Sequence, residues 1–127
     1  MKNKNYVLTK AEMIVMEALW SIGHSASVRD VLDRYGEPKP AYTTIATFLK
    51  VLTLKGFVEA KKKSTGKTLF YTPLITKERY RRQVMNEVKD SLFGGSAKSL
   101  VDFFVHEEQL TAEELQDLLD MINTPEP

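Results

Sequence analysis

The sequence predicts a mostly α-helical fold with one small β-hairpin, divided into a unit of residues 1–75 and a unit of residues 76–127. Two motifs support the helices, because Thr9-Lys-Ala-Glu12 and Thr111-Ala-Glu-Glu114 are capping boxes followed by apolar residues at helical spacing. The hairpin follows from residues 57–72, where two short runs of strand-forming residues flank a basic turn that contains glycine. The predicted order is three helices, a hairpin and three more helices.

The composition is typical of a soluble globular protein. Of the 127 residues, 43% are apolar and 28% are charged, which is enough to bury one good core or two small ones. The absence of cysteine excludes disulfides, thiolate metal sites and cysteine nucleophiles, and it fits a reducing compartment. The sequence has neither a run of about 18 apolar residues nor a hydrophobic segment at its start, so we expect a cytoplasmic protein without membrane insertion.

The charges are distributed unevenly, although the net charge is only +1. Residues 1–37 hold five basic and five acidic side chains, residues 38–82 hold eleven basic and two acidic ones, and residues 83–127 hold two basic and ten acidic ones. A basic middle segment followed by an acidic tail indicates two parts with different partners, the first of them a polyanion. The alternative is an ordinary solvated charged surface.

Local signals delimit the elements of the first unit. The helix that begins after Thr9 is expected to end at Gly23, and Ser27 caps a short second helix that ends at Tyr35-Gly36. A third helix is expected at residues 41–55, and two strands at 57–61 and 68–72, with Pro73 stopping the second. Three helices followed by a basic hairpin give the order of a winged helix-turn-helix, whose third helix lies in the major groove of DNA.

The third predicted helix has an unusual outer face. Residues 40–57 contain no acidic side chain, and the face opposite Ile45, Phe48, Leu49 and Leu52 is rich in threonine, which is a poor helix former. Carboxylates would repel phosphates, whereas threonine offers a hydroxyl and a methyl group that can approach base edges closely. Such a face is better suited to contact double-stranded DNA than to remain an ordinary solvent-exposed helix surface.

We predict that lysines beside this helix and in the hairpin bind the flanking phosphates and thereby fix the register on the duplex. The predicted DNA-contacting residues are Lys39, Tyr42, Thr43, Thr44, Ala46, Thr47, Lys50, Lys61, Lys62, Lys63 and Lys67. The alternative for the same surface is a winged-helix module that binds another protein without DNA sequence specificity.

The second unit reads as three helices that begin near Thr76, Ala97 and Thr111, the first of them broken at Gly94-Gly95. These helices cover about 48 residues, which is near the lower size limit for an independent core, so we expect a homodimer. The predicted dimerisation residues are Tyr80, Val84, Val88, Leu92, Leu100, Val101, Phe103, Phe104, Leu115, Leu118, Leu119 and Ile122. The alternative is a monomer whose tail packs onto its own first unit.

Several short runs, in the same order, resemble one family. They are Leu8 to Glu12, Met16 to Trp20, Thr43 to Thr47, Lys55 to Val58, Phe70-Tyr71, Phe93 to Gly95, Ser99 to Val101 and Phe104-Val105. Over about residues 7 to 122 the chain resembles the BlaI/MecI/CopY family of penicillinase-type repressors. The resemblance implies a homodimeric repressor with a winged helix at the N-terminus and an interlocked helical dimerisation unit behind it.

The resemblance also implies roles for single residues. Thr44 and Thr47 match positions that contact the operator in the family, whereas Ala46 stands where the antibiotic-resistance branch tends to carry arginine. The copper-responsive branch has a C-terminal cysteine motif, which this sequence lacks. In the antibiotic-responsive branch a membrane-bound metalloprotease sensor is implied in cutting an Asn-Phe bond in the dimerisation unit. The corresponding bond here joins Phe103 and Phe104, and the pair is interpreted either as this cleavage site or as part of a core.

The sequence offers little for an enzyme. The histidines are His24 and His106, which lie far apart in the chain and have no carboxylate or histidine neighbour at metal-ligand spacing. No glycine-rich phosphate loop follows a strand, because Gly66 belongs to the hairpin turn and Gly94-Gly95 joins two helices. We therefore expect no catalytic residues, no metal site and no cofactor.

Overall fold

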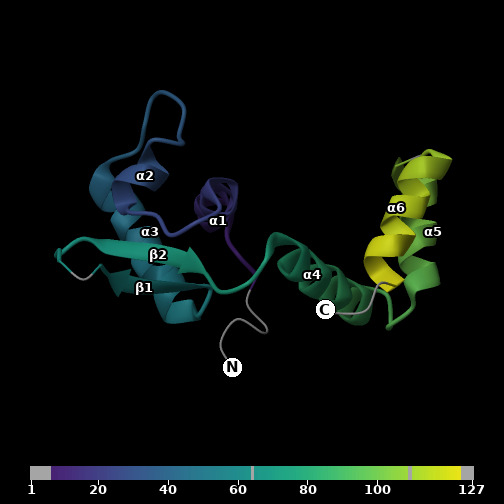
Figure 1. Ribbon diagram of the computed structural model, residues 1–127. Coiled ribbons are helices and arrows are strands. Elements are labelled where there is room, and N and C mark those ends of the chain that lie inside the picture. The colour runs from purple at the N-terminus through teal and green to yellow at the C-terminus, as the bar shows by residue number, and fades with distance from the viewer. Residues whose placement is uncertain (1–6, 64, 109, 124–127) are drawn as a thin grey trace. The chain divides into compact units, whose positions relative to one another are not determined.

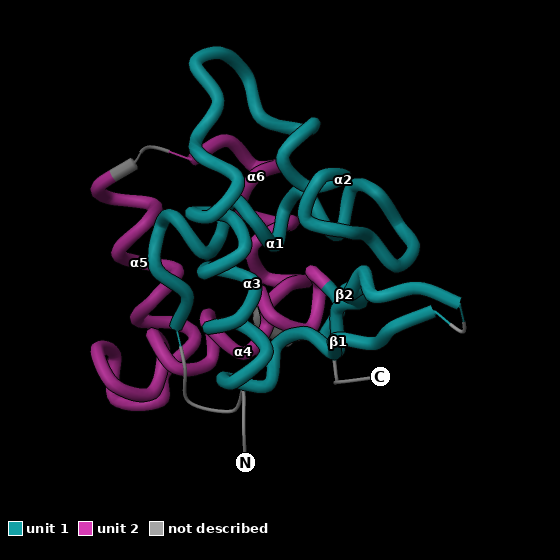
Figure 2. Tube along the Cα trace, turned by 90° about the vertical axis from the view of Figure 1, so that its left-hand side faces the viewer, with its two compact units in different colours: residues 1–76 teal, residues 77–127 magenta. Residues whose placement is uncertain are grey.

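The chain divides into two compact units, residues 1–76 and residues 77–127, which are described separately (Figure 2). The computed structural model describes residues 7–63, 65–108 and 110–123, and for residues 108, 122 and 123 it describes the backbone alone. The predicted fold class is confirmed, since the described chain is mostly helical with one two-stranded antiparallel hairpin after the third helix.

The first unit contains three helices and the hairpin (Figure 1). Its elements are α1 (Lys10–Ile22), α2 (Val28–Leu32), α3 (Tyr42–Lys55), β1 (Val58–Lys62) and β2 (Leu69–Pro73). Helix α2 ends earlier than Tyr35-Gly36, where the sequence placed its end. Pro73 was expected to stop β2 but is its last residue, paired with Val58, because a strand end tolerates the missing amide donor of proline.

The predicted helix caps of this unit are confirmed. The Thr9 hydroxyl accepts a hydrogen bond from the Glu12 amide at 3.1 Å, and the Glu12 carboxylate accepts one from the Thr9 amide at 2.9 Å. Ser27 forms the equivalent pair of bonds with Asp30 at the start of α2. At the other end of α1 and α3, glycines adopt the left-handed conformation that terminates a helix.

The second unit consists of α4 (Lys77–Leu92), α5 (Ala97–Glu108) and α6 (Ala112–Asn123). Helices α5 and α6 pack side by side, and α4 also contacts α6 (Figure 1). The Thr111 hydroxyl accepts from the Glu114 amide at 3.1 Å, as the sequence predicts for the start of α6. No helix in the described part of the chain is long and apolar enough to span a membrane.

The core of the first unit determines how α3 is oriented. Ile45, Leu49 and Leu52 are fully buried on one face of α3, in a core that also buries Leu19 of α1 and Phe57 just before β1. Because these three α3 positions lie on one stripe of the helix, their burial leaves the opposite stripe outside. The sequence-predicted division of α3 into an apolar face and a threonine face is therefore present in the fold.

One ion pair joins the end of α3 to the start of α1. The Lys55 ammonium lies 2.7 Å from the Glu12 carboxylate, which is almost completely buried. Burial alone would raise the pKa of Glu12, but hydrogen bonds from Lys55 and Thr9 and the Lys55 charge outweigh it and hold that pKa below its ordinary value. Glu12 thus caps α1 and anchors α3 with the same side chain.

We expect Glu12→Gln to lower the free energy of unfolding by about 2 kcal/mol at pH 7, because it removes a charge that is hydrogen-bonded in the folded state. A lowered pKa means that this stability is present above the ordinary glutamate value of about 4.3 and is lost as the pH falls through the lowered value. The difference between wild type and variant, measured by urea denaturation, should therefore shrink toward pH 3.

Glu59→Gln is the matched control, because Glu59 pairs with Lys61 at the exposed surface and such pairs contribute little. Equal losses in the two variants, or a Glu12→Gln loss that does not change with pH, would contradict the anchoring role of Glu12.

Candidate nucleic-acid interface

The outer face of α3 presents hydroxyl and methyl groups. Tyr42, Thr43, Thr44, Thr47 and Lys50 are exposed. The Thr47 hydroxyl donates to the Thr43 carbonyl at 2.9 Å, which turns its hydrogen away from solvent. No hydrogen bond to the hydroxyls of Thr43 and Thr44 is found among the described residues, so both can bind a ligand. Ala46, also on this face, is half-buried.

The hairpin carries the second group of predicted residues. Lys61, Lys62, Lys63 and Lys67 are all exposed. Lys61 lies 3.0 Å from the Glu59 carboxylate, and the Lys63 ammonium lies 4.3 Å from the centre of the Phe70 ring. Both contacts are at the surface, where they constrain a lysine only weakly. The hairpin therefore presents a cluster of solvated cations.

Backbone pairing fixes the hairpin beside the helices. Tyr71 in β2 accepts a hydrogen bond from the Ala26 amide at 3.0 Å and donates one to the Ala26 carbonyl at 2.7 Å. Ala26 lies just before Ser27, the cap of α2, and β1 packs against α3. Helix α3 and the hairpin therefore lie against each other within the first unit (Figure 1).

Lys39 is the predicted site residue whose surroundings differ most from the expectation. Its ammonium donates to the Tyr35 carbonyl at 2.6 Å and to the Leu32 carbonyl at 3.4 Å. These carbonyls lie at and just beyond the end of α2, where the helix dipole attracts a cation. Lys39 therefore stabilises the turn between α2 and α3, a role that the sequence analysis did not assign to it.

Arg29 was missed by the sequence analysis. It is exposed on α2, and its guanidinium lies 5.5 Å from the centre of the Tyr42 ring at the start of α3. In the sequence, a single arginine on a short helix looks like an ordinary surface residue. Its contact with Tyr42 is visible only in the fold. The sequence did hold one signal that could have pointed to Arg29. This residue lies on α2, which is the first helix of the helix-turn-helix, and that helix crosses the DNA backbone.

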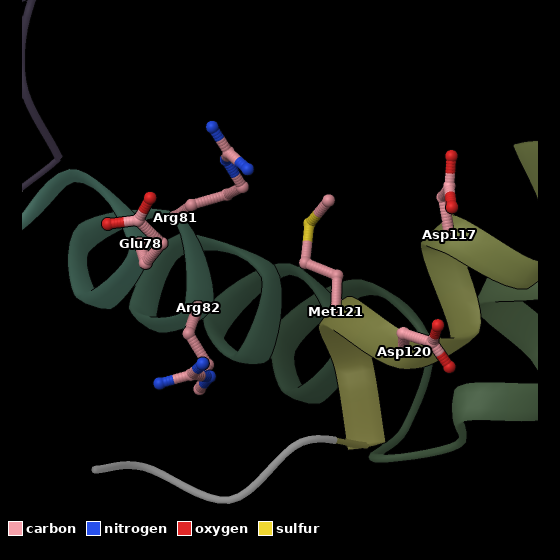
Figure 3. Close-up of a pocket in the computed structure, with 6 residues that line it drawn as sticks. All are labelled: Glu78, Arg81, Arg82, Asp117, Asp120 and Met121. Atoms are coloured by element: carbon pink, nitrogen blue, oxygen red, sulfur yellow. The ribbon is translucent and has the colours of Figure 1, made fainter.

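A hollow of about 470 Å³ lies in the second unit, between α4 and α6 (Figure 3). Its lining residues are Glu78, Arg81 and Arg82 from α4 and Asp117, Asp120 and Met121 from α6. Figure 3 shows Arg81 and Arg82 leaving α4 in different directions. Because arginines and carboxylates are mixed here, the hollow selects no single charge. The described residues contain no group of histidines and carboxylates that could hold a metal ion.

The predicted dimerisation residues are incompletely buried within one chain. Of these, Tyr80 and Leu100 are buried, whereas Leu92 is 73% exposed and Phe103 is 46% exposed. The half-buried ones are Val84, Val88, Val101, Phe104, Leu115, Leu118 and Leu119. The side chain of Ile122 lies outside the described residues. Phe103 packs edge-on against Phe104 with ring centres 5.5 Å apart.

Comparison with known proteins identifies the family. Residues 8–124 match the penicillinase repressor family. The chain is 28% identical over 124 residues to the methicillin resistance regulatory protein MecI of Staphylococcus aureus strain N315, covering 97% of this chain and 98% of the relative. It is 26% identical to the penicillinase repressors of Staphylococcus aureus and of Bacillus licheniformis, with coverage of 97% and 91% of this chain and of 96% and 88% of those relatives.

The family match spans both units of the chain, and it agrees with the winged-helix order of α1, α2, α3 and the hairpin. It also confirms the prediction that the protein is not an enzyme, which rests on the family and not on any missing feature of the structure. The chain belongs to the penicillinase repressor family of DNA-binding transcriptional repressors.

Proposed function

We propose that this repressor acts in the cytoplasm as a homodimer, that it binds a two-fold symmetric operator, and that each α3 enters the major groove. The observation that carries the proposal is the acid-free, exposed threonine face of α3 beside a hairpin of exposed lysines. DNA phosphates repel carboxylates and attract lysines, whereas base edges accept short hydroxyl and methyl groups.

The contacts divide into two classes. Thr43 and Thr44 have hydroxyls available for base edges, and the Thr47 methyl group suits a thymine methyl because its hydroxyl is already bonded. Lys50 and the hairpin lysines act on phosphates, as does Arg29 on α2, and these contacts set affinity and register without selecting a sequence. Lys39 acts indirectly, by holding the turn that precedes α3.

The homodimer is proposed from the second unit. Its helices leave Leu92 and Phe103 substantially exposed, and most other apolar residues of the set are only half-buried. A second copy can cover such a surface, and two copies related by a two-fold axis place their α3 helices on half-sites about one helical turn apart.

Release of the operator is proposed to follow cleavage of the Phe103-Phe104 bond by a membrane-bound metalloprotease sensor. The bond lies within α5, so a protease must first open that helix to reach an extended backbone. Cutting there would separate α6 from α4 and weaken the dimer. Mass spectrometry of the protein after induction tests this: fragments ending at Phe103 are expected, and an intact chain on a released operator would contradict it.

The competing function is a winged-helix module for protein binding. Selection of duplexes from a random pool, followed by titration at about 50 and 200 mM salt, separates the two functions. A repressor should select a palindromic site and lose affinity by orders of magnitude between these salts. Absence of sequence preference together with a weak salt response would support the protein-binding module.

We expect Thr44→Ala to weaken operator binding by about 1–3 kcal/mol and to relax the preference at one base pair per half-site, because a base-edge contact is lost. Lys62→Ala should weaken binding to all sequences alike and reduce the salt slope, because it removes only a phosphate contact. Both are measured by titrating the selected duplex and single-base variants of it. Unchanged affinity and preference in Thr44→Ala would refute the proposed placement of α3.

We expect Leu118→Asp to dissociate the dimer and to lower operator affinity with it, because it places a charge in the proposed apolar interface. Sedimentation velocity gives the oligomeric state, and titration of the selected duplex gives the affinity. Ala112→Asp is the control, since this exposed residue in the first turn of α6 tolerates a negative charge. A Leu118→Asp protein that stays dimeric would refute the interface.

A further inference from the structure

A hollow of about 400 Å³ lies in the first unit, between α2, the start of α3 and the hairpin. Its polar lining comes from Tyr42 on α3, Lys67 and Thr68 in the hairpin turn, and Tyr71 on β2. Apolar side chains, Leu69 among them, form the remaining wall, and none of the lining residues carries a carboxylate. The hollow therefore offers hydroxyl donors and one cation to a ligand, with no acidic group to oppose an anion.

Tyr71 is the most deeply buried of the polar residues that line this hollow. It is 94% buried, since only 6% of its surface is exposed, and its backbone is held on both sides, by Ala26 and by Ala60 of β1. No hydrogen bond to its hydroxyl is found in the described part of the chain. The hydroxyl oxygen is not one of the buried polar atoms that lack a partner, so it keeps access to the hollow and can donate a hydrogen bond to a ligand.

The neighbouring groups keep Tyr71 a donor. Burial, followed by the nearby phenol of Tyr42, raises the pKa of Tyr71, so its hydroxyl remains protonated at physiological pH. Tyr42 itself is held from the outside by the guanidinium of Arg29, 5.5 Å from its ring centre. Two phenols, the Thr68 hydroxyl and the Lys67 ammonium thus line a single hollow.

We propose that this hollow binds one phosphodiester group of the operator in each half-site, with Tyr71 and Tyr42 donating hydrogen bonds to its oxygens. The inference rests on the proposed function, in which α3 occupies the major groove. The hollow lies between α3 and the hairpin turn, where the strand must pass from the groove that α3 contacts to the flanking segment that the lysines follow. The deoxyribose of that nucleotide packs on Leu69, and the contact fixes the register of α3 without selecting a base.

The test uses the full chain and the duplex that it selects, prepared with a neutral methylphosphonate at one phosphate at a time. In the wild type, this replacement at the phosphate in the hollow should cost about tenfold in affinity for lack of a hydrogen-bonded charge, beside losses at the phosphates that the other cations contact. Tyr71→Phe removes only the hydroxyl and should weaken the native duplex by a similar factor. At the phosphate in the hollow, and at no other, the methylphosphonate should then cost Tyr71→Phe several-fold less than it costs the wild type, because the Tyr71 contact is already absent.

Tyr35→Phe is the matched control, because Tyr35 is another partly buried tyrosine of the same unit, and it lines a different hollow, beside α1. This variant should bind every duplex as the wild type does. Lys67→Met, a change in the exposed hairpin turn, provides a second variant in case Tyr71→Phe disturbs folding, which thermal melting would reveal. It should show the same coupling to the same phosphate.

Three results would overturn the inference: native affinity in Tyr71→Phe, an equal methylphosphonate loss in wild type and variants, or displacement of the operator by inorganic phosphate at constant ionic strength. The last result would mean that the hollow prefers a free anion. A wild type that selects an operator but shows no coupling refutes this phosphate site alone. A wild type that selects no sequence refutes the proposed function, and the phosphate site with it.

Discussion

Burial of Ile45, Leu49 and Leu52 is the constraint on which the rest of the first unit depends. These three side chains press one face of α3 into the core, and the helical period then fixes which residues remain outside. Glu12 adds a directional anchor, since its buried carboxylate caps α1 and pairs with Lys55 at the end of α3. Contacts on the opposite side of the helix therefore hold the threonine face in position. The residues of that face are not needed for the core, so their types can be set by the ligand that they bind.

The hairpin extends that surface because backbone bonds hold it there. Both bonds between Ala26 and Tyr71 join the segment before α2 to β2, so the hairpin cannot swing away from α3 without breaking them. The same bonds place the Tyr71 ring in the wall of the hollow. Tyr71 therefore has two roles. Its main chain fixes the hairpin, and its side chain faces the proposed phosphate. Part of the charge asymmetry of the sequence then has a physical meaning, since Lys50 and the hairpin lysines lie in the same unit as the α3 face without carboxylates.

Features set by a few neighbouring residues could be predicted from the sequence. The capping boxes at Thr9 and Thr111 depend on residues three positions apart, and both form. The period of α3 likewise follows from its own residues. What escaped prediction depends on residues distant in the chain: the contact of Arg29 with Tyr42, and the hollow in which Tyr42 and Tyr71 meet. Lys39 was predicted to bind a phosphate from its charge and its place beside the third helix, whereas the carbonyls that bind it become available only where α2 ends.

The central claim is that the threonine face of α3 and the hairpin form one DNA-binding surface. Amide and methyl chemical shifts of the full chain, recorded during titration with its selected duplex at about 150 mM salt, test this claim most directly. The account predicts that the largest changes fall in residues 42–50 and 61–71, and that the buried face of α3 changes little. Changes concentrated on α1, or spread evenly over the first unit, would contradict it.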